Sequence, residues 1–286
     1  MNKRKDCLKI KTLLKCLPLI LVSSCQAWSP APESDLLEYE LKGDVASMRN
    51  TSYNLDSTAD GYKVTGIETS MSNLYVEFDS AGRKTLLQRF GKDMRPGVRE
   101  EYTYNGDGQI ETKSVIMSDG AVREKSVYSY VRGRLHSLTV TDGSDSLKKY
   151  EKYEYFPKDS IRARLSFRGD TVNGYRVVKF DDKGRNIGIV SYTADGRKVM
   201  SQIDVVYDSL DRRIFTKSND LFFREMESKM SYNEDGFRSG LEITGRGRTM
   251  TYSFTFRTDE AGNWIERTTY RDGRPLRFEK REIRYR

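Results

Sequence analysis

The sequence is poor in the residues that most catalytic and metal sites require. Its 286 residues include one histidine, His136, and three cysteines, Cys7, Cys16 and Cys25, all close to the N-terminus. A nucleophile–histidine pair or a Cys/His metal site needs partners that the chain after residue 25 does not supply. It also holds no phosphate-binding glycine-rich motif and no nucleophile-elbow motif. We therefore predict a protein that is not an enzyme, with no catalytic residues, no metal and no other cofactor.

Long apolar runs and the apolar spacing of helices are also missing after the first 24 residues. The mean hydropathy is −0.72, and 18 tyrosines and 12 phenylalanines make up a large part of the apolar content. Aromatic side chains of this kind suit half-buried strands, in which the ring packs and its edge stays wet. Only six prolines are present, so disorder is not the favoured interpretation. The composition predicts strands and excludes a large, dry core.

The formal net charge of +8 is concentrated in the first 24 residues, which hold six basic residues and one acidic residue. The remaining chain holds 44 basic and 41 acidic residues, a net charge of +3. These charges alternate in sign along the chain, as expected for a solvated face. We therefore predict no nucleic-acid partner.

Residues 1–24 have the pattern of a secretory signal, because a basic stretch precedes a short apolar segment over residues 16–22. This segment is too short to span a bilayer as a helix. Val22-Ser23-Ser24-Cys25 then resembles the bacterial lipobox. The resemblance implies a lipoprotein whose first mature residue is a diacylated Cys25, which would be its membrane partner. The alternative is ordinary cleavage after Ala27, which would give a secreted protein.

The residues that follow Cys25 predict where the chain would be held. Gln26 stands where many bacteria place an aspartate to retain lipoproteins in the inner membrane, so we expect an outer-membrane lipid anchor. The sequence leaves open which leaflet carries it. Residues 25–35 are rich in Pro, Ser and acidic residues and predict a tether.

One sequence motif recurs through the rest of the chain. An aromatic residue is followed by Asp or Asn, then by two further residues, then by Gly and often by Arg. Phe78-Asp79 to Gly82-Arg83 is the first copy, and the closing positions are 82, 108, 133, 159, 184, 211, 236 and 262. Asp or Asn can open a tight turn through its own side chain, and Gly supplies the positive φ that closes it. A steady interval of 25–27 residues indicates a repeat architecture. The structural turn residues that we single out are Asp79, Gly82, Gly108, Gly133, Asp181, Gly184, Gly236 and Gly262.

A second turn marker, such as Asp119-Gly120 or Asp195-Gly196, follows each first marker by nine to twelve residues. Each unit therefore holds two strands of about eight residues joined by hairpins. We predict an all-β domain over residues 36–286, with an atypical first unit (36–73) and about eight units over 74–286. It would be an antiparallel meander of about 16 strands. So many strands form a curved or half-barrel-like sheet, because open sheets rarely exceed about ten strands.

These units resemble the Rhs or YD-repeat family over residues 74–286. Phe78-Asp79 to Gly82-Arg83 and Phe180-Asp181 to Gly184-Arg185 match its turn best, while position 159 and position 211 carry Asp in place of Gly. The resemblance implies a binding or encapsulating scaffold and no catalytic residues to carry over. The chain is much shorter than the family members that build shells around a cargo.

Signal and repeat together favour one function and leave two alternatives. Our leading hypothesis is a lipid-anchored cell-envelope protein that acts as a non-enzymatic binding or structural scaffold. The first alternative is a glycan-binding surface lipoprotein with an aromatic concave face. The second is a carrier of lipid or another apolar ligand within the curl of the sheet. The identity of any glycan or protein ligand is not encoded in a motif.

Overall fold

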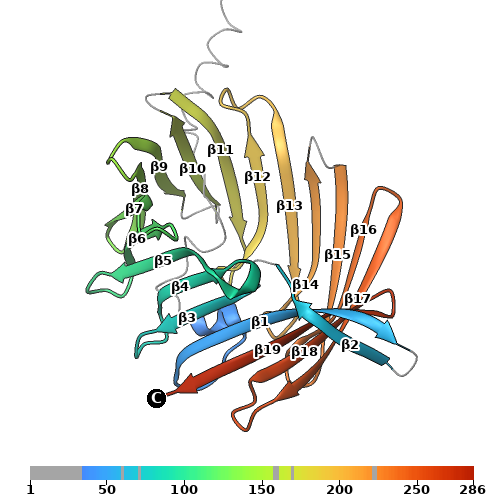
Figure 1. The fold of residues 1–286 in the computed structure, drawn as a ribbon. Coiled ribbons are helices and arrows are strands. Elements are labelled where there is room, and N and C mark those ends of the chain that lie inside the picture. The colour runs from blue at the N-terminus through green and yellow to red at the C-terminus, as the bar shows by residue number, and fades with distance from the viewer. Residues whose placement is uncertain (1–33, 59–60, 70–71, 157–160, 169–170, 221–223) are drawn as a thin grey trace, which may run out of the picture.

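The computed structural model describes residues 34–58, 61–69, 72–156, 161–168, 171–220 and 224–286. The described chain contains 19 strands and two short 3-10 helices, η1 (Asp35–Tyr39) and η2 (Lys92–Met94) (Figure 1). The strands are β1 (Val45–Thr58), β2 (Gly61–Ile67), β3 (Leu74–Phe78), β4 (Lys84–Phe90), β5 (Pro96–Tyr104), β6 (Ile110–Ile116), β7 (Val122–Val131), β8 (Arg134–Asp142), β9 (Leu147–Phe156), β10 (Ile161–Arg168), β11 (Thr171–Phe180), β12 (Asn186–Tyr192), β13 (Val199–Tyr207), β14 (Arg213–Asp220), β15 (Arg224–Tyr232), β16 (Arg238–Gly245), β17 (Arg248–Thr258), β18 (Trp264–Arg271) and β19 (Arg274–Tyr285).

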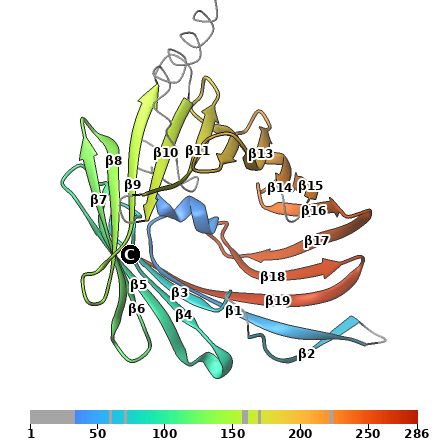
Figure 2. The same cartoon turned by 90° about the horizontal axis from the view of Figure 1, so that it is seen from above.

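The strands form one antiparallel sheet in which each strand from β3 to β19 pairs with the next along the chain. This arrangement confirms the predicted all-β meander. Strand β1 pairs with β19 over Val45–Asn54 and with β3 over Ser47–Asn50, so the hydrogen-bonded ladder that leaves β3 returns to it through β1. The predicted curvature is confirmed as well, and Figure 2 shows the strands curving around η1.

A shift in register recurs at the aromatic position of the repeat and contributes to this curvature. In β3 the shift falls between Glu77 and Phe78, and the amide of Gly82 donates to the carbonyl of Asp79 over 2.9 Å. Equivalent shifts fall at Tyr104, Tyr130, Phe180, Tyr207, Tyr232 and Thr258. A bulge bends its strand and increases the local twist. Register shifts also fall in six of the intervening hairpins, near the turns at the opposite end of the sheet. Bulges at both ends can therefore contribute to the bending of the sheet.

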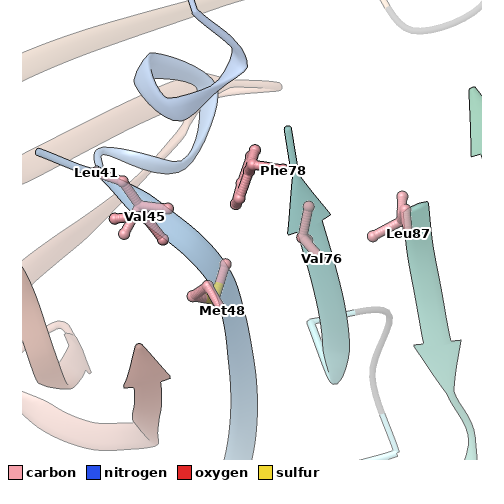
Figure 3. Close-up of a cluster of buried hydrophobic side chains, with 6 residues drawn as sticks. All are labelled: Leu41, Val45, Met48, Val76, Phe78 and Leu87. Atoms are coloured by element: carbon pink, nitrogen blue, oxygen red, sulfur yellow. The ribbon is translucent and has the colours of Figure 1, made fainter. Parts of the chain in front are cut away.

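The main apolar core lies where the first unit meets the repeats (Figure 3). It consists of Leu41, which follows η1, together with Val45 and Met48 of β1, Val76 and Phe78 of β3, and Leu87 of β4. A second buried cluster gathers residues from β8, β9 and β11, namely Leu135, Leu138, Tyr153 and Val178. Much of the remaining buried surface is polar, including Glu151, Glu279 and Arg281. The thin aliphatic content of the sequence thus corresponds to two small cores.

The first unit, over residues 36–73, has its own arrangement of elements. It contains η1, the 14-residue strand β1 and the seven-residue strand β2, which pairs with β1. The predicted signal segment, Cys25 and residues 25–33 of the predicted tether lie outside the described residues. The last two residues of that tether, Ser34 and Asp35, are the N-cap and first residue of η1.

Candidate functional site

The predicted turn residues form a row of similar turns at one end of the sheet. Gly82, Gly108, Gly133, Gly184, Gly236 and Gly262 all adopt positive φ, between +72° and +87°. Asp211, which replaces Gly in its copy, adopts φ +62°. The turn around position 159 lies outside the described residues. Each of these turns closes its own hairpin, so the predicted turn residues are not gathered into one ligand site.

Within three of these turns, an aspartate holds the arginine four residues later. Asp79 Oδ1 accepts hydrogen bonds from the amides of Ala81 (3.0 Å) and Arg83 (2.9 Å), and Asp79 Oδ2 accepts one from Arg83 Nε (2.7 Å). The same contacts join Asp181 to Arg185 and Asp208 to Arg212. The aspartate therefore shapes the turn and aims the guanidinium at once.

The arginines also set the charge state of these aspartates. Partial burial alone would raise the pKa of Asp79, but the hydrogen bonds and positive charge of Arg83 outweigh it and hold the pKa below its ordinary value. The pKa values of Asp181 and Asp208 are lowered by the same balance. The ionised carboxylates therefore stabilise the fold above their ordinary pKa, and this contribution is lost as the pH falls through the folded-state pKa.

Each such arginine packs on a tyrosine of the next unit. Arg83 Cζ lies 4.6 Å from the centroid of the Tyr104 ring, and the Tyr104 hydroxyl donates to the carbonyl of Lys84 (2.7 Å). Arg185 with Tyr207 and Arg212 with Tyr232 repeat both contacts. Arg134, whose turn has no equivalent aspartate, makes the same two contacts with Tyr155. Sequence analysis missed this contact between units, although the interval of 20–22 residues from Arg to Tyr is visible in the sequence.

A segment that we call the N-terminal bridge, residues 34–44, connects the first turn of the row to the last. At one end, Ser34 Oγ donates to the carbonyl of Gly82 (3.0 Å), and Asp35 Oδ2 accepts from the amide of Lys84 (2.6 Å). At the other end, the amide of Lys42 donates to Asn263 Oδ1 (2.6 Å), and Asn263 Nδ2 donates to the carbonyl of Lys42 (2.9 Å). The bridge thus ties together units about 180 residues apart.

The bridge also supplies charged residues to two buried clusters. In the first, the Lys84 cluster, Lys84 Nζ donates to Glu38 Oε2 (2.9 Å) and lies 5.3 Å and 5.2 Å from the ring centroids of Tyr39 and Tyr102. Burial alone would lower the pKa of Lys84, but Tyr39 and the Glu38 carboxylate outweigh it and raise that pKa above its ordinary value. Lys84 therefore remains charged while it holds η1 against β4.

The second, which we call the Trp264 cluster, joins the bridge to β18 and β19. Trp264 is fully buried, and its Nε1 donates to Glu40 Oε2 (2.8 Å). Arg267 Nε donates to Glu279 Oε2 (2.8 Å), and Arg267 Nη2 lies 2.7 Å from the same oxygen. The guanidinium carbons of Arg267 and Arg281 lie 4.5 Å and 3.3 Å from the centroid of the Trp264 ring. Two arginines thus pack against the same buried indole ring.

Arg281 is the exception to the pairing in this cluster. Its Nε and Nη1 are buried and have no hydrogen-bond partner in the described part of the chain. Burial and repulsion by Arg267 lower the pKa of Arg281 to about 9, although the carboxylates of Glu40 and Glu279 favour its charged form. A guanidinium in this position costs folding free energy, since its charge is desolvated without full compensation.

The described residues contain no group of three His, Cys, Asp or Glu side chains that could hold a metal ion. His136 lies exposed on β8. No helix in the described ranges is long and apolar enough to cross a bilayer. The charged side chains in the two buried clusters contact one another and the aromatic rings, so their observed chemistry is that of structural ion pairs.

The contact between Gly82 and the bridge leads to a matched pair of substitutions. Gly133 (φ +73°) has nothing within 4 Å of an added Cβ, so we expect Gly133→Ala to cost about 1–2 kcal/mol for the left-handed backbone alone. Gly82→Ala has the same backbone cost at φ +72°, but its Cβ would overlap Ser34 Oγ and lie 3.1 Å from Leu36 Cδ1. We expect a larger loss of stability in urea unfolding, together with faster proteolysis at residues 34–44. Equal losses with unchanged proteolysis would show that the bridge does not depend on this turn.

No family model matches the sequence, and no curated protein matches it. Among solved structures, the chain is similar to a porin-like protein from Bacteroides uniformis ATCC 8492, with 13% identity and a TM-score of 0.42 over 85% of this chain and 99% of that one. It is also similar to a porin-like protein from Bacteroides vulgatus ATCC 8482, with 11% identity and a TM-score of 0.36 over 85% of this chain and 98% of that one. A third similar structure is TcdB2-TccC3 without its hypervariable C-terminal region, with 12% identity and a TM-score of 0.33 over 79% of this chain and 15% of that one. At these values the likeness establishes neither a family nor a function.

Proposed function

We propose that this chain is a lipid-anchored protein of the cell envelope whose repeat sheet serves as a non-enzymatic scaffold. The observation that carries the proposal is the N-terminal bridge. It begins nine residues after Cys25, the cysteine of the lipobox-like motif. It contacts the first turn of the repeat row through Ser34 and the last turn through Lys42. A pull on an acylated Cys25 would therefore reach both ends of the repeat array.

The contacts between units support a scaffold for a second reason. The Arg–Tyr pairs use the recurring side chains of the repeat to join neighbouring turns, with the Tyr hydroxyl closing on a backbone carbonyl. In repeat proteins, stability comes from such contacts between neighbours. The recurring residues are thus engaged in holding the array together, which is the property that a scaffold requires.

The buried polar residues make a carrier of apolar ligands the weaker alternative. Lys84, Glu151, Glu279 and Arg281 are all buried. An apolar ligand among such charged groups would deprive them of polar neighbours at a high free-energy cost. Native mass spectrometry of the purified protein, with no bound lipid detected, is the result that agrees with this argument.

Glycan binding through an aromatic face is also less well supported. Trp264, the most suitable ring for stacking on a sugar, has an exposed fraction of 0%. The guanidinium groups of Arg267 and Arg281 already pack against its ring. An aromatic sugar site in the described residues would therefore have to be built from tyrosines and phenylalanines, of which Tyr62 and Tyr285 are among the exposed ones.

The anchor is tested by Cys25→Ala, with Cys16→Ala as the matched control. We expect the wild-type chain and the Cys16 variant to fractionate with the outer membrane after density-gradient separation, because acylation at one residue gives stable anchoring. The Cys25 variant should accumulate unprocessed, as should the wild type under globomycin, which blocks lipoprotein signal peptidase. Normal processing of Cys25→Ala, with full membrane retention, would rule out the lipid anchor and leave the scaffold without its proposed attachment.

A further inference from the structure

Positive charge is concentrated at the C-terminal end of the array. Residues 238–286 contain 12 basic and seven acidic residues, and 11 of the 12 are arginines. Residues 25–237 contain 32 basic and 34 acidic residues, so the excess belongs to the last four strands. Several of these arginines are used within the fold, as in the ion pairs of Arg257 with Glu266 and of Arg277 with Glu68.

Four of the others lie together on two neighbouring hairpin turns and remain exposed. Arg246 and Arg248 flank the β16–β17 turn, and Arg271 and Arg274 flank the β18–β19 turn. No acidic side chain in the described part of the chain lies within ion-pair distance of any of the four. Both turns lie at the end of the sheet opposite the row of Asp–Arg turns, two strand spacings or about 10 Å apart. We call these four residues the arginine face.

The acid within this face is already engaged. Asp272 Oδ1 accepts hydrogen bonds from the amide of Thr251 (2.9 Å) and from its Oγ1 (3.0 Å). These two bonds, followed by the charge of Arg271, lower the pKa of Asp272, so it stays ionised. It thus offsets one of the four positive charges and leaves a local excess of three.

The backbone at Arg246 adopts a conformation that is unusual for arginine. Arg246 adopts φ +52° and Gly247 φ +71°, the pattern of a hairpin turn in which Asn, Asp or Gly is favoured at the first position. The neighbouring turn follows that preference with Asp272 (φ +50°) and Gly273 (φ +78°). An arginine in the left-handed region costs about 1–2 kcal/mol. Arg132 has the same conformation outside the arginine face, so the proposal rests on the grouped, exposed charges and not on this strain.

We propose that the arginine face binds an acidic polysaccharide through its sulfate, phosphate or carboxylate groups. Guanidinium groups present a rigid fork of donors that matches such oxyanions. The two turns consist only of Gly, Arg and Asp. The turns themselves therefore offer no apolar side chain to a bilayer and no aromatic ring on which a nucleic-acid base could stack. The nearest exposed apolar side chains, Met250 and Leu276, stand on the strands beyond them, so vesicle binding is an outcome of the test. This inference does not depend on the scaffold or on its anchor.

The test measures binding of fluorescein-labelled dextran sulfate to the full-length chain in detergent by fluorescence anisotropy. The test variant replaces Arg246, Arg248, Arg271 and Arg274 with Gln. The control variant replaces four exposed basic residues elsewhere with Gln, namely Arg95, Arg123, Lys125 and Arg132. Arg132 is an informative control because it adopts φ +51° in the β7–β8 turn. Both variants carry the same change in charge, and circular dichroism confirms that each is folded.

We expect saturable binding by the wild type that weakens steeply with salt, because bound arginines release counterions. The test variant should bind at least tenfold more weakly with a smaller salt dependence, and the control variant should stay within twofold of wild type. An equal loss in both variants, or no binding by the wild type, would overturn the proposal. The proposal would also be overturned if the protein bound phosphatidylglycerol vesicles but not dextran sulfate. The same holds if it bound single-stranded DNA as tightly as dextran sulfate. The anchoring of Cys25→Ala is a separate readout, so either proposal can fail alone.

Discussion

Replacing Arg267 with methionine is expected to destabilise the protein by about 3–5 kcal/mol, whereas Arg281→Met is expected to leave stability unchanged or to raise it. The two arginines pack against the same ring, Trp264, and stand on adjacent strands. Only Arg267 is paired: its guanidinium holds Glu279, whose side chain is 3% exposed. Removing Arg267 leaves that carboxylate buried without its cation.

Arg281 differs because its buried charge destabilises the folded state. Two of its nitrogens are buried without a partner in the described part of the chain, and its pKa falls to about 9, well below the ordinary value of an arginine. The unfolded chain therefore binds this proton more tightly than the folded chain. The contribution of this group to the free energy of unfolding therefore increases as the pH rises from about 9 toward the ordinary pKa of an arginine. Methionine keeps much of the side-chain volume and removes the charge.

Urea unfolding at pH 7 checks both variants. Arg267→Lys serves as a control that keeps the positive charge but loses the planar pair of guanidinium donors. We expect the lysine variant to fall between wild type and Arg267→Met, since an ammonium group can still reach Glu279 but cannot match two parallel donors. If Arg281→Met proves as destabilising as Arg267→Met, then Arg281 has a partner in solution, and the account of the Trp264 cluster is wrong.

The sequence predicts most of the fold because the chain reversals are encoded locally. Gly82, Gly108 and Gly184 close their turns at positive φ, the conformation for which glycine is favoured. A fixed interval between such turns leaves room only for short strands, and an antiparallel meander follows. The return of the ladder through β1 could not be predicted in this way. β1 belongs to the first unit, where the turn spacing departs from the period and gives no register.

The clusters around the N-terminal bridge could not be predicted for a different reason. Trp264 contacts Glu40 across 224 residues of sequence, and Asn263 contacts Lys42 across 221. No local pattern marks such pairs, because they depend on where the bridge crosses the finished sheet. The arginine face lies between these extremes. Its charge excess is visible in the sequence, but only the alternation of hairpins shows that its two turns share one end.

A final prediction concerns one repeat position whose residues have unequal energetic roles. Phe78 and Tyr232 both stand immediately before the Asp or Asn that opens a turn. Phe78 is buried in the main core, with Tyr39 packed edge-on at 5.7 Å, so Phe78→Ala should cost about 3–5 kcal/mol. Tyr232 is half-buried, and its hydroxyl donates to the carbonyl of Arg213 (2.7 Å). Tyr232→Phe should cost about 1 kcal/mol, the net worth of one hydrogen bond.

Urea unfolding of both variants gives the two free energies, and Phe78→Leu is the matched control for the first. Leucine retains an apolar side chain in the core, so we expect it to recover more than half of the loss in Phe78→Ala. The repeat motif then specifies geometry at every copy, while burial decides the energy at each one. If Phe78→Ala costs no more than Tyr232→Phe, the stability of the array is spread evenly over its units. The core where the bridge meets β3 would then contribute no more to the free energy of unfolding than other parts of the array.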